Sequence, residues 1–149
     1  MKYVVGFSFN EDMSRVLLML KNRPEWQEGK YNGVGGKIDG DETPIEAMVR
    51  EFREETGVAT LPEDWYELAL LHGTDHAGDK FEVHCFSTEK ILAFYNATSM
   101  TDELLFRAAV STPALFPERY VPSVPWLIWL ARDKNMRDRR MRVQAHYEY

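Results

Sequence analysis

The sequence predicts an α/β protein built on a mixed β-sheet. Stretches with the apolar alternation of strands are interleaved with one strongly marked helix and a second helix near the C-terminus, without a regular β-α-β repeat. A length of 149 residues is typical of one domain and is enough to bury a core without disulfides. We therefore expect a single domain over residues 1–149, of which residues 133–149 form a charged C-terminal tail.

The expected strands lie before and after the marked helix. Five segments are predicted to be strands: 2–9, 14–21, 65–72, 80–87 and 91–96. Residues 22–40 are rich in glycine and predict a loop threaded by short extended pieces. Residues 97–113 fit no single element. The apolar stretch Val124–Arg132, which follows several prolines, predicts a closing helix.

The first helix has clear start and stop signals. Thr43 suits the N-cap, Pro44 the first helical position, and Glu46 completes a T-x-x-E capping box. Gly57 suits the residue just after the helix. Apolar residues at i, i+3, i+4 and i+7 predict one buried face, which consists of Ile45, Met48, Val49 and Phe52.

Three carboxylates share one stripe beside that buried face. Glu51, Glu54 and Glu55 lie in the C-terminal half of the helix, where they repel one another and the helix dipole adds to the cost. Arg50, four residues from both Glu46 and Glu54, can relieve part of this repulsion. The stripe is either a solvated acidic face or a site for a hard divalent cation, Mg²⁺ before Mn²⁺. Helix geometry alone leaves both interpretations open.

The residues around the helix decide between these interpretations. The sequence satisfies the pattern G-x5-E-x7-R-E-U-x-E-E-x-G-U, where U is apolar, through Gly36, Glu42, Arg50, Glu51, Phe52, Glu54, Glu55, Gly57 and Val58. In this pattern and in its flanking segments, over roughly residues 3–132, the chain resembles the Nudix hydrolases. The resemblance implies a mixed β-sheet sandwiched between α-helices. It also implies Mg²⁺-dependent hydrolysis of a phosphoanhydride in a nucleoside diphosphate linked to another group.

The resemblance assigns roles to individual residues. It implies that Glu51, Glu54 and Glu55 bind the metal, together with a backbone carbonyl from Gly35 or Gly36. Arg50 is implied to orient the glutamates, and Glu42 to brace the loop. A downstream glutamate, for which the candidate is Glu103, would complete the metal shell or act as the base, and it can also be an ordinary loop acid. The general base stays open among Glu51, Glu55 and Glu103.

Substrate preference is predicted from the segment that leads into the helix. Residues 31–37, Y-N-G-V-G-G-K, are similar to the W-N-G-x-G-G-K of the MutT-like branch, which hydrolyses purine nucleoside triphosphates, including oxidised ones. Asn32 would read the base, since an amide offers both a donor and an acceptor, and Tyr31 and Lys37 would complete the substrate site. Lys21 and Arg23 either meet the phosphates or are solvated.

We therefore predict hydrolysis of a nucleoside triphosphate to a monophosphate and pyrophosphate. The alternatives are a Nudix hydrolase of ADP-ribose, a nucleotide sugar or capped RNA, and a non-catalytic nucleotide sensor on the same fold. The intact set of glutamates argues against the sensor. The expected partner is the nucleotide substrate, and the oligomeric state is left open.

Composition excludes other classes of partner. A net charge of −6 argues against broad binding to nucleic acid or anionic lipid, and the length leaves no room for a DNA-binding domain. The longest apolar runs have about six residues, far below the roughly 20 of a membrane helix. The lone Cys85 lies in an apolar run and is expected to be buried. These features predict a cytoplasmic protein.

Several residues outside the motif have two interpretations. His72, His76 and His84 suggest zinc, but their spacing fits no tight site. Trp126 and Trp129 are expected to pack in the core rather than stack on a base. The arginines of the tail either contact RNA or a partner protein, or lie on a solvated terminal helix: Arg132, Arg137, Arg139, Arg140 and Arg142.

Overall fold

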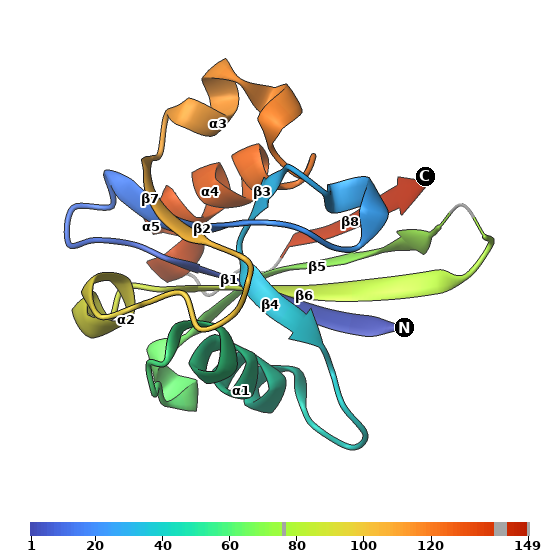
Figure 1. Ribbon diagram of the computed structural model, residues 1–149, viewed down its shortest axis with the longest axis horizontal. Helices are drawn as coiled ribbons and strands as arrows, with labels where there is room; N and C mark the ends of the chain where they lie inside the picture. The colour runs from blue at the N-terminus through green and yellow to red at the C-terminus, as the bar shows by residue number, and fades with distance from the viewer. Residues whose placement is uncertain (76, 139–142, 149) are drawn as a thin grey trace.

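The computed structural model describes residues 1–75, 77–138 and 143–148, whose strands form a five-stranded and a three-stranded sheet (Figure 1). In chain order the elements are β1 (Lys2–Ser8), β2 (Arg15–Leu20), β3 (Tyr31–Asn32), β4 (Val34–Lys37), α1 (Pro44–Thr56), β5 (Tyr66–Thr74), β6 (Lys80–Thr88), α2 (Ile91–Tyr95), β7 (Leu105–Ala109), α3 (Thr112–Leu115), α4 (Val124–Arg132), α5 (Lys134–Asp138) and β8 (Val143–Glu148). Short 3₁₀ turns cover Glu25–Gln27, Pro62–Asp64 and Pro117–Arg119.

The larger sheet is mixed, as predicted. Its strand order is β4-β1-β6-β5-β8, in which β1 pairs parallel to β6 and antiparallel to β4. β5 is antiparallel to β6 and parallel to β8. The smaller sheet places β2 between β3 and β7, antiparallel to both. The four predicted strands over 2–9, 14–21, 65–72 and 80–87 are found within about two residues of their expected bounds.

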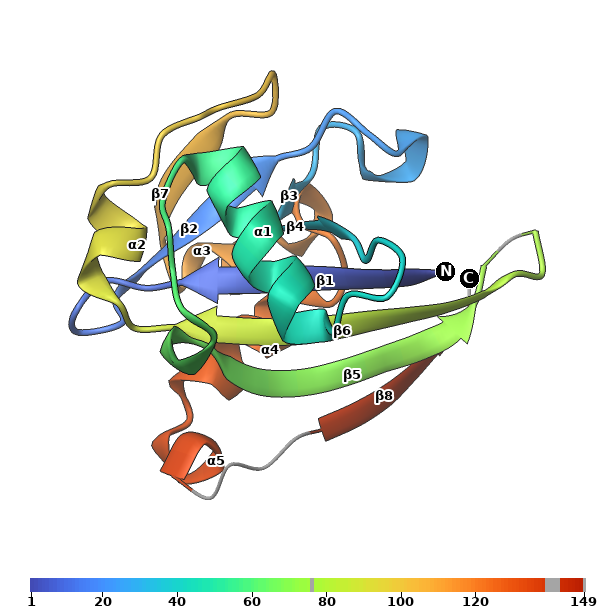
Figure 2. The ribbon, with the colours of Figure 1, turned by 90° about the horizontal axis from the view of Figure 1, so that it is seen from below.

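Two apolar clusters cover the two faces of the five-stranded sheet. Val4 joins a cluster with Met48 and Phe52 of α1, whereas its neighbour Val5 joins a cluster with Leu127 of α4. This alternation is the period of two expected of a strand that is buried on both faces. The sheet is thus sandwiched between α1 and α4, which lie on opposite sides of it (Figure 2). The predicted fold class is confirmed.

Helix α1 begins and ends where its sequence signals predict. The Thr43 hydroxyl accepts a hydrogen bond from the Glu46 amide, and the Glu46 carboxylate accepts one from the Thr43 amide, each at 3.3 Å. Gly57 closes the helix in the left-handed region at φ 78°, which costs glycine little. Phe52 is fully buried and packs edge-on against Trp65, with 5.1 Å between ring centroids.

One predicted strand is a helix. Residues 91–96 were expected to be extended, but Ile91–Tyr95 form α2, in which Ala93 and Phe94 are buried and Ile91 and Leu92 are exposed. A continuous apolar run of this length carries no periodicity that separates a strand from a helix. The strand that pairs with β2 comes instead from the unassigned stretch 97–113, as β7.

The C-terminal segment also differs from its expectation. The predicted closing helix is found as α4, but the stretch expected to be a charged tail contains α5 and then β8, which pairs with β5. Val143 and Ala145 of β8 pack against the core cluster under α4, and this apolar alternation favours a strand. Arg139, Arg140 and Arg142, and the side chain of Arg137, lie outside the described residues, as does His76.

Two further packing expectations have different outcomes. Trp129 is not in the core, since its side chain is 65% exposed. The buried stripe of α4 runs instead through Val124, Leu127 and Ile128, while Trp126 is partly buried. Cys85 is fully buried as predicted, and burial raises the pKa of its thiol. Within the described residues, every helix is too short or too polar to span a membrane.

The buried face of α1 gives a direct test of the packing. Phe52→Ala removes a fully buried ring and should lower the free energy of unfolding by about 3–5 kcal/mol. The neighbouring Arg53 is exposed, so Arg53→Ala should change it by no more than about 0.5 kcal/mol. Urea denaturation measures both, and an unchanged midpoint for Phe52→Ala would contradict the assigned face.

Candidate active site

The site begins where α1 crosses the glycine pair of β4. Glu51 is only 8% exposed, and its carboxylate lies directly against Gly36. A Cβ on Gly36 would stand 2.5 Å from the Glu51 carboxylate, and a Cβ on Gly35 would overlap the carbonyl oxygen of Val4. The two glycines therefore allow the helix to bring a carboxylate onto the backbone of β4, next to β1.

Arg50 holds three of the surrounding carboxylates together. Its guanidinium donates two hydrogen bonds to Glu42, at 2.7 and 2.9 Å, and one each to Glu51 and Glu54 at 3.0 Å. It also donates to the backbone carbonyl of Lys37 at 3.0 Å. The hydrogen bonds that Arg50 donates to Glu42 raise the pKa of Arg50, although burial acts the other way. Arg50 is thus a fixed positive centre.

The loop before α1 supplies one partner of Arg50, Glu42. Glu46, which lies four residues from Arg50, closes the capping box at Thr43 as predicted. Glu42 also accepts a hydrogen bond from the Asp39 amide at 2.8 Å. The hydrogen bonds from Arg50 hold the pKa of Glu42 below its usual range. This network braces the loop between β4 and α1.

Part of the negative charge on the stripe is left without compensation. Burial raises the pKa of Glu51, and the hydrogen bond from Arg50 offsets this only in part. Burial also raises the pKa of Glu55, whose carboxylate accepts a hydrogen bond from the Thr101 hydroxyl at 3.2 Å. The like charge of Glu54 adds to both shifts. Burial and mutual repulsion make it costly for these carboxyl groups to ionise. A cation bound here would offset that cost, because it is attracted to the ionised form.

The donor set fits a hard divalent cation. Carboxylate and backbone carbonyl oxygens are the ligands that Mg²⁺ prefers, and Mn²⁺ accepts the same set. Among the described residues, no three His, Cys, Asp or Glu side chains already converge on a point that could hold a metal ion. Arg50 bridges Glu51 and Glu54 in this arrangement, so a cation would have to take over one of these contacts.

Glu103 approaches the cluster from the segment before β7. It is 4% exposed and accepts hydrogen bonds from the Lys21 ammonium at 2.9 Å and the Asn22 amide at 2.6 Å. Burial raises the pKa of Glu103, but these two bonds outweigh it and hold the pKa below its usual range. Its own amide donates to Thr101, which bonds Glu55, so Glu103 is linked to the stripe through one side chain.

Comparison with known proteins identifies the family. The model of the NUDIX domain matches residues 2–118, which contain the glycine pair, Arg50 and all the glutamates of the site. This protein belongs to the Nudix family. It is accordingly a hydrolase of nucleoside diphosphate derivatives.

Solved structures share the Nudix fold. A MutT protein from Bacillus halodurans is 17% identical over 98% of this chain and 89% of its own, with a TM-score of 0.69. A MutT protein from Methanosarcina mazei Go1 is 19% identical over 91% of this chain and 94% of its own, with a TM-score of 0.67. The NUDIX domain of Shewanella oneidensis NrtR, determined with ADP ribose, is 18% identical over 91% of this chain and 88% of its own, with a TM-score of 0.73.

The two basic residues that were expected either to meet phosphates or to be solvated, Lys21 and Arg23, both form ion pairs. Lys21, at the end of β2, is paired with Glu103, and Arg23 donates to Asp102 at 2.7 Å. Arg23 and Asp102 are both largely exposed, whereas the side chain of Lys21 is 14% exposed. Lys37 is exposed at the end of β4, beside Gly36. The structure thus brings Lys21 and Lys37 to the borders of the glutamate cluster.

Tyr31 and Asn32 form the short strand β3, which pairs with the end of β2. The Asn32 amide group donates to Gln27 at 3.3 Å and accepts from the Gly33 amide at 2.8 Å. Tyr31 contacts two rings that sequence analysis did not single out, Phe106 and Tyr120, each with centroids 5.5 Å away. Both come from distant segments, and no local pattern marks them. Thr101 could have been found, because it belongs to a segment that resembles the family.

The role of Arg50 can be tested without touching any carboxylate. Lysine keeps the charge but cannot donate in a fork to Glu42 while also holding Glu51 and Glu54. Arg50→Lys should lower the kcat of phosphoanhydride hydrolysis about 10- to 100-fold with little change in KM, as for other groups that orient ligands. Steady-state kinetics measures this, with Arg53→Lys as the control on the same helix. A wild-type kcat in Arg50→Lys would contradict the orienting role.

The burial of Glu55 predicts a dependence of stability on pH. Its pKa is raised in the fold, so the protein loses stability as pH rises through the interval between the ordinary value of 4.5 and the raised one. Without divalent metal, Glu55→Gln should match the wild type below about pH 4.5 and be the more stable protein at neutral pH. Denaturation curves across this range provide the measurement. Glu54→Gln, whose carboxylate is exposed and paired with Arg50, should show no such gain.

Proposed function

We propose that this Nudix hydrolase is an Mg²⁺-dependent pyrophosphohydrolase that converts a purine nucleoside triphosphate, in normal or oxidised form, to a monophosphate and pyrophosphate. One observation carries the proposal. In the segment 31–37, which resembles the MutT-like branch, Asn32 lies four residues before Gly36. The carboxylate of Glu51 lies against Gly36. Four residues span at most about 14 Å. A single short segment can therefore border both the base and the phosphates of one nucleotide.

The chemistry is assigned to the glutamates of α1. We assign metal binding to Glu51, Glu54 and Glu55, with a backbone carbonyl from Gly35 or Gly36. Bound Mg²⁺ would offset the charge of the phosphates and polarise the attacked phosphorus, and Mn²⁺ could replace it. The raised pKa values of Glu51 and Glu55 support this assignment, because clustered, partly buried carboxylates gain most from a cation.

The general base is best sought among the same glutamates. A base must be free to accept a proton and gains from a pKa nearer neutrality. Burial raises the pKa of both Glu51 and Glu55, whereas Glu103 accepts strong hydrogen bonds from Lys21 and the Asn22 amide. We therefore assign the base to Glu51 or Glu55. Glu103 would hold Lys21 in place at the border of the site instead of binding metal.

Substrate binding is assigned to the residues around the glutamates. Lys37 and Lys21 are proposed to meet the phosphates, with Arg23 further out. Tyr31 would support the base-binding side through its contacts with Phe106 and Tyr120. Asn32 would exchange its contact with Gln27 for the base edge. The proposal includes a cytoplasmic location, where such nucleotides are found.

A second substrate class has one observation in its favour. The NUDIX domain of NrtR, which was determined with ADP ribose, has a TM-score of 0.73 to this protein. A nucleoside diphosphate linked to a sugar, such as ADP-ribose or a nucleotide sugar, or a capped RNA, is therefore the alternative. A non-catalytic sensor is disfavoured, because binding alone gives no reason to keep three mutually repelling glutamates on one helix.

A nucleotide panel separates these functions. The protein is incubated with Mg²⁺ and each of the nucleoside triphosphates, 8-oxo-purine triphosphates, ADP-ribose and nucleotide sugars, and pyrophosphate, phosphate and monophosphate are measured. Pyrophosphate with a monophosphate from purine triphosphates supports the proposal. Preferred cleavage of ADP-ribose or a nucleotide sugar moves the assignment to the second class. No turnover of any substrate, with tight nucleotide binding, would indicate a sensor.

The base contact is tested by Asn32→Ala. Losing a hydrogen bond to the base costs about 1–3 kcal/mol, which corresponds to a rise in KM for purine triphosphates of roughly 5- to 150-fold. Pyrimidine triphosphates should lose less, and the Mg²⁺ dependence should not change. Gln27→Ala is the matched control, because it removes the loop partner of Asn32 but no base contact. Equal losses in the two variants and for all bases would mean that Asn32 only shapes the loop.

A further inference from the structure

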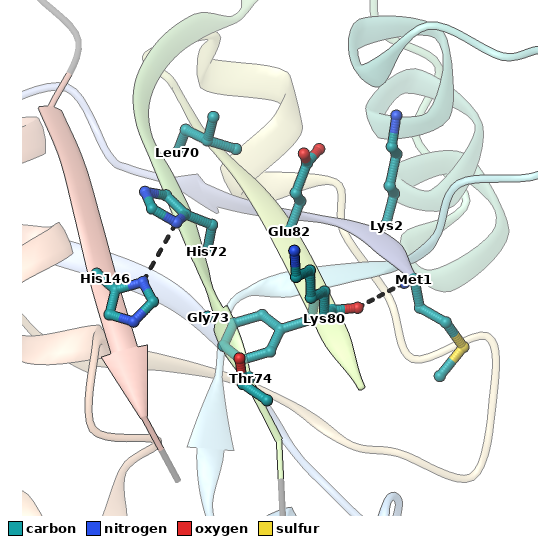
Figure 3. A pocket seen from close by; sticks show the side chains of 10 residues that line it. Met1, Lys2, Leu70, His72, Gly73, Thr74, Lys80, Glu82 and His146 are labelled. Carbon is teal, nitrogen blue, oxygen red and sulfur yellow. Dashed lines mark hydrogen bonds between the residues drawn. The ribbon is translucent and has the colours of Figure 1, made fainter. Parts of the chain in front are cut away.

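A trough of about 500 Å³ lies at the end of the five-stranded sheet where β1 begins (Figure 3). Residues of four of the five strands line it, namely β1, β6, β5 and β8, and its polar walls include Lys2, Glu82, His72 and His146. None of the residues that line it belongs to the glutamate stripe of α1. The trough is therefore separate from the proposed active site.

Three of these side chains form one row across the sheet. Glu82 of β6 is directly opposite His72 of β5, and His72 is directly opposite His146 of β8. Directly opposed residues project from the same face of a sheet, so the two imidazoles and the carboxylate share one wall. The Nδ1 atoms of the two histidines face each other at 3.4 Å (Figure 3).

This separation is the one that a tetrahedral zinc ion requires. With Zn–N bonds of about 2.0–2.1 Å and a tetrahedral angle, two nitrogen ligands lie about 3.3–3.4 Å apart. A hydrogen bond in which one ring carries its proton on Nδ1 accounts for the same distance. If both rings carry their proton on Nε2, both Nδ1 lone pairs can be directed at one ion between them.

We propose that His72 and His146 form a binding site for Zn²⁺ or a similar divalent ion that prefers imidazole ligands. This site is distinct from the proposed Mg²⁺ site on α1. Imidazole selects Zn²⁺, Ni²⁺ or Cu²⁺ over Mg²⁺, whereas the glutamate stripe has the opposite preference. The site is open: two protein ligands are in place, and water supplies the rest. Glu82, the next member of the row, is directed to another partner, since its carboxylate lies 3.5 Å from Nε2 of His84.

The consequence of metal binding is mechanical. His72 belongs to β5, an interior strand of the sheet, whereas His146 belongs to β8, the strand at its edge. A metal held by both rings fastens the C-terminal strand to β5. Because the ion binds only when the two strands are paired, it stabilises the docked state in proportion to its concentration.

The site is tested with zinc added to the metal-free full chain in the presence of excess Mg²⁺, which fills the carboxylate site. NMR of the histidine ring nitrogens reports on each imidazole directly. The Nδ1 signals of His72 and His146 should shift together at one equivalent of zinc. The His84 signals should stay in place, because His84 lies off the pair. Hydrogen exchange over residues 143–148 should slow in parallel.

Variants connect the binding to the two rings. Calorimetric titration should show zinc binding weakened by about tenfold or more in both His72→Gln and His146→Gln. Gln144→Ala, an exposed change on the same strand, should bind zinc as the wild type does. Undisturbed Nδ1 signals, or binding that survives both histidine variants, would overturn the proposal. So would binding that is lost in Glu54→Gln and kept in His72→Gln, since the zinc would then sit on the glutamates.

Discussion

The contact between Arg50 and its three carboxylates is the interaction on which the site depends. One guanidinium joins the loop before α1, through Glu42 and the carbonyl of Lys37, to the helix itself, through Glu51 and Glu54. Without it, the glutamates would repel one another next to a helix terminus that is already negative. The same contact fixes the distance between β4 and α1, so the electrostatic compensation and the shape of the site have one cause.

The sequence predicts the fold well where a local signal and the tertiary contact agree. Helix α1 is an example, because the capping box, the apolar face and Gly57 each specify the same bounds, and all are found. The segment 91–96 shows the opposite case: its apolar run fits a strand or a helix, and the structure places a helix there while β7 pairs with β2. The C-terminal strand was missed because its pairing partner, β5, lies about seventy residues away in the sequence.

The candidate site divides in the same way. The stripe of glutamates could be predicted, since it depends on spacing within one helix. The partner of Lys21 could not, because its contact with Glu103 joins residues 82 positions apart. The ring contacts of Tyr31 and the meeting of His72 with His146 are likewise products of topology. These contacts between distant segments depend on which strands become neighbours, which no short motif encodes.

The paired glycines of β4 have a consequence for how this chain can vary. Gly35 lies against the backbone of Val4, and Gly36 lies against Glu51. There is therefore no room for a side chain at either of these two successive positions. A slip of one residue would bring the side chain of Val34 or Lys37 into one of these contacts. The two glycines therefore fix the register in which β4 pairs with β1. Insertions and deletions in this strand would misalign helix α1 with the loop that Glu42 and Arg50 brace.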